Sequence, residues 1–287
     1  IASAGIIAPV IPPSIGFVVF GVAANVSISK LFLAGIFPGI VLAAGLWATW
    51  WWMTRREHLT PPPKRTRAEV WASFRSAGWA LLLPVIILVG LRMGVFTPTE
   101  AAVVAAVYAL FVAAVIYKEL SLKQLYEVFH TAAKTTAVIM FLVAAAMVSA
   151  WLITVAQLPN QVIALLQPLL DSPMLLMVAM MVLVMAVGTA MDMTPTILIL
   201  TPVLMPLVKA AGIDPVYFGV LFIINNSIGL VTPPVGTVLN VVAGVGRMRM
   251  DDVTRGVFPF MVVQFIVLFL MVLFPQIVMW PARLLYG

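Results

Sequence analysis

The sequence predicts an all-α polytopic membrane protein, and three observations lead to this fold class. Of the 287 residues, 63% are hydrophobic and only 9% are charged, whereas a soluble domain carries about 25% charged residues. Unbroken apolar runs such as 31–52 and 257–274 approach the roughly 20 residues that cross a bilayer as a helix. Strands of a membrane barrel would instead alternate apolar and polar residues over about ten positions. Helices therefore satisfy the backbone in the membrane.

Prolines and polar stretches divide the chain into the expected elements. Segment 54–75 is a polar, basic loop, and 120–134 is amphipathic and expected to lie along the membrane interface. Segment 174–208 would be about 52 Å long as one helix, longer than the roughly 30 Å hydrocarbon core. We therefore expect it to break between Gly188 and Pro195. The expected apolar segments are 2–26 and 217–245, each broken at a proline pair, and 31–53, 77–91, 100–117, 136–155, 160–170, 174–208 and 257–280.

The basic residues predict the orientation. If the loop 54–75 is cytoplasmic and 136–170 forms a re-entrant hairpin, twelve of the 16 Lys and Arg residues lie on the cytoplasmic side. The four outside are Lys30, Arg92, Lys209 and Arg283. A full span at 136–170 would reduce the ratio to nine against seven, so the positive-inside rule favours the hairpin. The net charge of +6 resides in these loops and does not indicate nucleic-acid binding.

A repeat relates two distant parts of the chain. Pro12-Pro13 is followed by Gly35-Ile-Phe-Pro38, and Pro233-Pro234 is followed by Gly256-Val-Phe-Pro259, at a constant offset of 221 residues (233 − 12, 256 − 35, 259 − 38). The charge count places the link near Lys30 outside and the link 247–255 inside, so the two copies have opposite orientations. Inverted repeats with broken helices that meet near the midplane are typical of secondary transporters.

The repeat also predicts the division of the chain. Residues 1–53 form the end of the first repeat, 54–134 the basic loop with two scaffold spans and the interfacial helix, and 135–287 the second repeat. By symmetry a hairpin and a broken helix of roughly a hundred residues would precede the first copy. Because residue 1 is an Ile within an apolar stretch, we expect the chain to be N-terminally truncated.

The proline pairs are candidate cation sites. Two consecutive prolines remove two backbone donors and leave the carbonyls of the preceding turn without partners. In a membrane this is tolerated only where the backbone is buried or lines a cavity, and the freed oxygens suit Na⁺. The alternative is a kink needed only for helix packing. The polar residues around the pairs favour ion binding by Pro12, Pro13, Ser14, Asn226, Thr232, Pro233 and Pro234.

Further polar residues are candidates for substrate binding. An acid in an apolar segment suggests function, yet Asp192 lies between a Gly and a Pro and could equally cap a helix end. We group it with Gly188 and Thr194. Pro159 marks the expected hairpin tip, where a helix N-terminus could face a substrate carboxylate.

Other features indicate structure or exclude chemistry. Glu100 fits a helix start capped by Thr97 or Thr99. The chain has no Cys, two His, no phosphate-binding loop and no paired nucleophile and base, so nothing in it predicts an enzyme.

Five stretches along the chain carry a resemblance to a known family: Gly5–Ser14, Leu31–Gly39, Gly94–Ala102, Ile197–Leu204 and Gly229–Gly236. They resemble the large membrane subunit of tripartite ATP-independent periplasmic (TRAP) transporters of the dicarboxylate-permease type. The resemblance covers nearly the whole chain and about the last two thirds of such a subunit.

This resemblance implies a sodium-driven elevator transporter in a bacterial inner membrane, with Na⁺ as coupling ion and no other cofactor. It implies a small four-helix membrane subunit and a periplasmic binding protein that delivers an organic acid, such as a C4-dicarboxylate or sialic acid. Carried over to this chain, the breaks at Pro12–Ser14 and Thr232–Gly236 would help form the sodium sites, and the tip near Pro159 would face the substrate. A stand-alone sodium/dicarboxylate symporter is the alternative.

Overall fold

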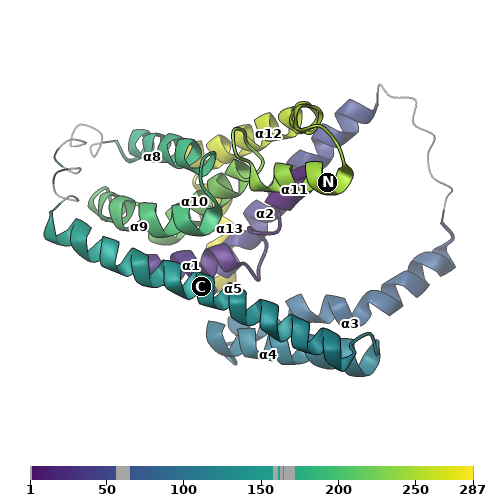
Figure 1. Cartoon of the computed structure of the whole chain (residues 1–287). Coiled ribbons are helices and arrows are strands. Elements are labelled where there is room, and N and C mark those ends of the chain that lie inside the picture. The colour runs from purple at the N-terminus through teal and green to yellow at the C-terminus, as the bar shows by residue number, and fades with distance from the viewer. Residues whose placement is uncertain (1, 56–64, 158–160, 162–163, 165–171, 287) are drawn as a thin grey trace. The chain divides into compact units, whose positions relative to one another are not determined.

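The computed structural model describes residues 2–55, 65–157, 161, 164 and 172–286, and it contains helices and no strands in these ranges. The chain divides into a larger unit, residues 1–52 and 139–287, and a smaller unit, residues 53–138 (Figure 1). Six helices of the described part have the length and composition to cross a membrane, which confirms the predicted class. They are Ile28–Thr54, Arg67–Arg92, Pro98–Ile116, Leu122–Ser149, Met193–Ala210 and Met250–Leu273.

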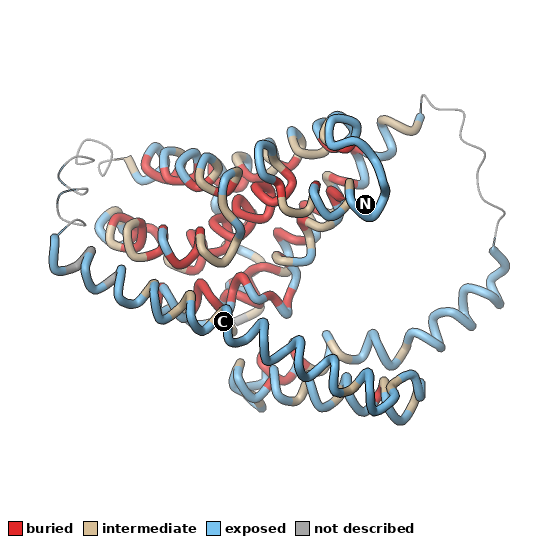
Figure 2. The backbone as a smooth tube through the Cα atoms, in the orientation of Figure 1, coloured by how far each residue is buried: buried red, intermediate tan, exposed pale blue. Residues whose placement is uncertain are grey.

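The larger unit is built around helix α10, Pro215–Gly229. Every residue of α10 from Val216 onward is buried, as expected for a helix that is apolar on all faces. Its neighbours α8, α9, α1 and α12 pack around it, and Figure 2 shows the buried residues gathering where these helices meet. The bounds of the neighbours are Pro173–Gly188, Met193–Ala210, Ile15–Ala24 and Met250–Leu273.

Aromatic side chains fix the packing of α1 on α10. The Phe20 ring lies 6.1 Å from the Phe218 ring and 5.6 Å from the Phe222 ring, measured between centroids. Gly219 makes room for this cluster, because a Cβ atom there would lie 2.4 Å from the Phe20 ring. The glycine therefore sets how closely the two helices approach.

The two segments related by the proline-pair repeat have the same order of elements. In the first, the 3₁₀ helix η1, Ala2–Ile6, is followed by a break, by α1 and by the long helix α2, Ile28–Thr54. In the second, α10 is followed by a break, by α11, Thr237–Gly246, and by α12. Helices α1 and α11 each have ten residues and each end at a left-handed residue, Asn25 and Arg247. Both segments are broken where the prolines predict.

The smaller unit contains α3, Arg67–Arg92, α4, Pro98–Phe111, the π-helical turn η2, Val112–Ile116, and the start of α5, Leu122–Val155. The Tyr108 hydroxyl donates to the Trp79 carbonyl at 2.7 Å, and the Tyr117 hydroxyl donates to the Ser76 carbonyl at 2.9 Å. These bonds join α3 to α4 and η2. A last helix, α13, Gln276–Tyr286, belongs to the larger unit.

Two sequence predictions about helix ends are confirmed. The 174–208 segment breaks as expected, since α8 ends at Gly188 and α9 begins at Met193. Thr97 rather than Thr99 caps α4: its hydroxyl accepts from the Glu100 N–H at 3.3 Å, and the Glu100 carboxylate accepts from the Thr97 N–H at 2.8 Å. This reciprocal pair is a capping box.

Three predictions about helix extents are wrong. Helix α3 begins at Arg67 rather than at 77, because Thr66 and Glu69 form a capping box in the polar segment. Segments 120–134 and 136–155 form one helix, α5, since neither Gly nor Pro interrupts residues 122–155. The last span ends at Leu273, just before Pro275. The second arm of the expected hairpin lies outside the described residues.

The Thr97 cap gives a testable prediction. Thr97→Ala removes the hydroxyl that accepts from the Glu100 N–H, and it should destabilise the protein by about 1 kcal/mol. Thr99→Ala is the matched control, because Thr99 lies one residue past the proline and holds no cap. Thermal unfolding of the detergent-solubilised protein measures the difference, and equal losses would contradict the assignment of the cap.

Candidate functional site

The first helix break comprises residues 7–14, and the Ser14 side chain forms hydrogen bonds at its end. The Ser14 hydroxyl accepts from the Phe17 N–H at 3.3 Å, so it caps α1, and it donates to the Pro9 carbonyl. Pro12 and Ser14 are buried, whereas Pro13 is exposed. The Pro12-Pro13 peptide bond is cis. Within the described part of the chain, no hydrogen bond reaches the carbonyls of Ile11, Pro12 and Pro13.

The second break comprises residues 230–236. Thr232 forms hydrogen bonds back to α10, and Gly236 is the residue before α11. The Thr232 N–H donates to the Gly229 carbonyl at 3.0 Å, and its hydroxyl donates to the Ile228 carbonyl at 2.8 Å. Gly236 caps α11 with φ 44°, a left-handed conformation that favours glycine. Here too the Pro233-Pro234 bond is cis, and among the described residues no hydrogen bond reaches the carbonyls of residues 231–234.

The two broken segments lie against each other. Helix η1 contacts α10, α11 and α12, and α1 contacts α10. A Cβ atom on Gly5 would lie 3.3 Å from Val238, and one on Gly16 would lie 3.2 Å from Ile223. The segment before each break thus packs against the helix after the other. No hydrogen bond joins the residues of one break to those of the other within the described ranges.

Three consecutive polar residues occupy the buried end of α10. Asn225, Asn226 and Ser227 are all fully buried. The Asn225 amide donates to the Met181 carbonyl of α8 at 2.6 Å, and the Asn226 amide donates to the Met193 carbonyl of α9 at 3.1 Å. These bonds tie both neighbouring helices to α10.

Both asparagines leave an oxygen without a partner. The Oδ1 atoms of Asn225 and Asn226 are buried and accept no hydrogen bond within the described chain. A buried acceptor that stays unsatisfied costs roughly 1–3 kcal/mol. These oxygens are therefore suited to a cation or a water molecule. Only Asn226 was expected as an ion ligand from the sequence, although Asn225 belongs to the same polar stretch and the Asn pair inside an apolar helix is a signal for both.

The turn between α8 and α9 lies beside the second break. The Val235 N–H donates to the Thr189 carbonyl at 3.2 Å. Gly188 approaches Gly229 so closely that a Cβ atom on Gly229 would lie 2.7 Å from the Gly188 carbonyl oxygen. A Cβ atom on Gly188 would in turn lie 3.3 Å from the unpaired oxygen of Asn226. The turn, the break and the asparagines thus form one neighbourhood, the candidate site.

Helix α9 begins in this neighbourhood without a side-chain cap. Asp192 occupies the N-cap position, yet its exposed carboxylate makes no cap hydrogen bond, and its carbonyl accepts from the Thr196 hydroxyl at 2.8 Å. Thr194 is half-buried in the first turn. Gly188, Asp192 and Thr194 therefore lie together, as the sequence predicts, whereas Pro159 lies outside the described residues.

Apart from the exposed Asp192 carboxylate, the oxygens of the candidate site are neutral. The described residues contain no group of three or more His, Cys, Asp or Glu side chains that could hold a metal ion. The available ligands are instead backbone carbonyls, amide oxygens and hydroxyls. Such ligands suit a hard monovalent cation that needs no negative charge at the site.

Comparisons with known proteins identify a family and its transport function. Residues 1–277 match the family model described as the DctM component of tripartite ATP-independent periplasmic transporters. A 2,3-diketo-L-gulonate TRAP transporter large permease protein of Escherichia coli is 59% identical over 283 residues, covering 99% of this chain and 67% of the relative. A sialic acid large permease protein of Vibrio cholerae is 39% identical, covering 100% and 67%. A C4-dicarboxylate large permease protein of Pseudomonas aeruginosa is 36% identical, covering 96% and 65%. The chain thus spans about two thirds of these relatives.

The packing around the first break is testable by a matched pair of glycines. A Cβ atom on Gly35 would lie 2.9 Å from the Val10 carbonyl oxygen and 2.5 Å from the Phe17 ring, whereas one on Gly256, its repeat counterpart, would meet nothing within 4 Å. Gly35→Ala should destabilise the protein by about 1–3 kcal/mol through overpacking. Gly256→Ala should leave the melting temperature unchanged or raise it. Equal effects in thermal unfolding would refute the close approach of α2 to the break.

Proposed function

Because this chain belongs to the DctM family of tripartite ATP-independent periplasmic (TRAP) transporters, whose matched relatives are large permease proteins, we propose that it couples the import of an organic acid to sodium. Transport rather than catalysis is common to the matched relatives, and the family together with the six apolar helices makes this chain a multi-pass protein of the bacterial inner membrane. The proposal has three components, which are sodium coupling, the substrate and the partners. The observations that support each of them follow.

The proposal of sodium coupling rests on backbone and amide oxygens that have no hydrogen-bond partner within the described residues. Carbonyls at both proline pairs receive no hydrogen bond in the described chain, and two amide oxygens in α10 are buried without partners. Unwound backbone that lines a midplane site coordinates Na⁺ in transporters built from broken helices. We assign ligand roles to the carbonyls around Pro12, Pro13, Pro233 and Pro234, with Asn226 and the Thr232 hydroxyl.

The predicted inverted orientation of the two proline-pair segments favours an elevator mechanism. The two segments share the order of break, ten-residue helix and long helix, and the charge distribution predicts opposite orientations for them. In the proposed mechanism the broken segments carry the site across the membrane as one body, and the spans around them serve as the scaffold.

The substrate is proposed to bind at the start of α9. The first N–H groups of α9 lack a side-chain cap, and the N-terminus of a helix favours an anion. A substrate carboxylate there would lie beside Thr194, Gly188 and the second break. The names of the relatives include 2,3-diketo-L-gulonate, sialic acid and C4-dicarboxylate. The 59% identical relative makes a sugar acid the first substrate to test.

The proposed partners are a small four-helix membrane subunit and a periplasmic binding protein that delivers the acid. The alternative is a stand-alone sodium/dicarboxylate symporter. Proteoliposomes that contain the full-length permease and its small subunit distinguish the two. We expect uptake only with a loaded binding protein and an inward Na⁺ gradient, and a K⁺ gradient should not replace it. Uptake without the binding protein would favour the symporter, and flux that neither saturates nor follows the gradient would indicate a channel.

The ligand role of Thr232 is tested by a single substitution. The Thr232 hydroxyl donates to a carbonyl four residues earlier, so its oxygen keeps free lone pairs. Thr232→Ala should raise the Na⁺ concentration for half-maximal uptake about tenfold, the loss expected for one contact to a charged group.

Ser149→Ala is the matched control, because the Ser149 hydroxyl also donates to a carbonyl four residues earlier and is exposed on α5. Its effect on Na⁺ dependence should be small. If both substitutions shift the dependence equally, the proline pairs serve as packing kinks and the proposed sodium site is wrong.

A further inference from the structure

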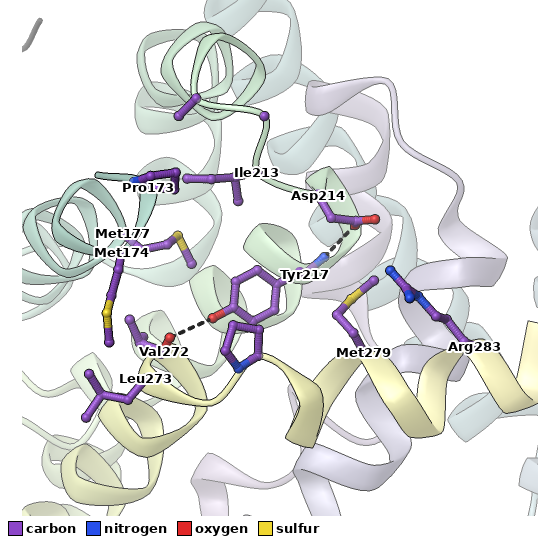
Figure 3. Close-up of a pocket in the computed structure, with 13 residues that line it drawn as sticks. Pro173, Met174, Met177, Ile213, Asp214, Tyr217, Val272, Leu273, Met279 and Arg283 are labelled. Carbon is purple, nitrogen blue, oxygen red and sulfur yellow. Dashed lines mark hydrogen bonds between the residues drawn. The ribbon is translucent and has the colours of Figure 1, made fainter. Parts of the chain in front are cut away.

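A groove lies at one end of the larger unit, away from the proline-pair breaks. It has a volume of about 460 Å³, and residues from the start of α8, the α9–α10 turn, the end of α12 and helix α13 line it. Figure 3 shows Tyr217 in its centre, with Met174 and Met177 on one side and Met279 and Arg283 on the other. Its size falls within the range of small-molecule sites.

The walls of this groove offer an apolar surface. The Tyr217 hydroxyl donates to the carbonyls of Met271 and Val272 at 3.0 and 3.2 Å, so the groove meets the ring rather than a free hydroxyl. The Asp214 carboxylate accepts from the Val216 and Tyr217 N–H groups at 2.7 and 3.0 Å and is thereby committed to capping α10. Methionines, flexible and polarisable, form much of the remaining wall.

One unpaired cation lies at the edge of the groove. Arg283 is exposed on α13 and forms no ion pair within the described residues, where Arg249 and Asp251 form the single salt bridge. A planar guanidinium binds phosphate and carboxylate groups with two parallel hydrogen bonds. The groove therefore combines an apolar interior with an anion-binding edge.

The groove also lies at the depth of the membrane interface. Helices α8 and α10 begin beside it, and the apolar span α12 ends there at Leu273. Its outer edge carries the exposed side chains of Met174 and Leu273, and Trp280 is exposed on the adjoining helix α13. Trp is enriched at the level of the lipid headgroups.

We propose that this groove binds one membrane phospholipid, with the phosphodiester at Arg283 and an acyl chain along the methionine-lined wall. A small soluble anion would leave the apolar wall unfilled, and an apolar peptide segment would leave the guanidinium unpaired. A phospholipid satisfies both at the same depth. The site is separate from the proposed sodium and substrate sites, so it does not depend on the transported acid.

The test is lipid binding to the purified, delipidated permease, measured by native mass spectrometry. The probes are phosphatidylglycerol and diacylglycerol with identical acyl chains, together with inorganic phosphate. We expect one phosphatidylglycerol to bind in preference to diacylglycerol and to resist displacement by inorganic phosphate. Arg283→Gln should reduce phosphatidylglycerol binding about fivefold, the contribution of one basic residue near an anionic lipid surface, and should abolish the preference.

Two further variants separate the groove from general effects. Arg255→Gln removes an exposed charge from the other end of α12 and should leave the preference intact. Met279 is half-buried and lines the groove, so the larger side chain in Met279→Trp should fill the groove and weaken the binding of both lipids. The proposal is overturned if Arg283→Gln binds as much phosphatidylglycerol as the parent, if Arg255→Gln loses as much, if inorganic phosphate displaces the lipid, or if Met279→Trp has no effect.

Discussion

A backbone carbonyl in hydrocarbon needs a partner, because an unsatisfied polar group there costs several kcal/mol. The same need applies to the N–H groups at the start of a helix. At the starts of α1 and α4 a hydroxyl accepts from such an N–H group, Ser14 from Phe17 and Thr97 from Glu100, and Ser14 also donates to the Pro9 carbonyl. At the proline pairs no hydrogen bond from the described residues reaches the carbonyls of residues 11–13 and 231–234. A break that leaves several oxygens unpaired in an otherwise apolar protein is best understood as a site that an ion or water completes.

The centre of the larger unit follows the same logic. Helix α10 is buried on all sides, yet it carries Asn225, Asn226 and Ser227 at one end. Each side chain donates a hydrogen bond to a main-chain carbonyl, and the two asparagines thereby join α10 to α8 and α9. The amide N–H groups of the two asparagines donate to the neighbouring helices, whereas their amide oxygens have no partner within the described residues. The polar residues thus join the helices around the candidate site and leave two buried amide oxygens without a partner there.

The sequence predicted features that depend on local chemistry. Prolines located the breaks, the Gly188–Pro195 stretch located the end of α8 and the start of α9, and Glu100 located a capped helix start. Two local features were misread: the polar character of residues 67–75 hid a capping box, and the change in polarity within 120–155 concealed one continuous helix. A feature that depends on neighbouring helices was missed as well. The hydrogen bonds of Asn225 and Asn226 could not be predicted from the sequence, because the Met181 and Met193 carbonyls that accept them lie on other helices.

The two proline-pair breaks show why the surroundings of a site are harder to predict than its position. Their sequences match at a constant spacing, yet their environments differ. Pro12 is buried and Gly35 lies against the Val10 carbonyl, whereas Pro233 and Pro234 are exposed and Gly256 faces open space. The shared Pro pair and Gly-x-Phe-Pro motif cannot produce this difference, so it comes from the other residues at each break, such as Ser14 and Thr232, and from tertiary contacts. In the transport mechanism proposed above, such a difference between the two breaks would serve alternating access between the two faces of the membrane.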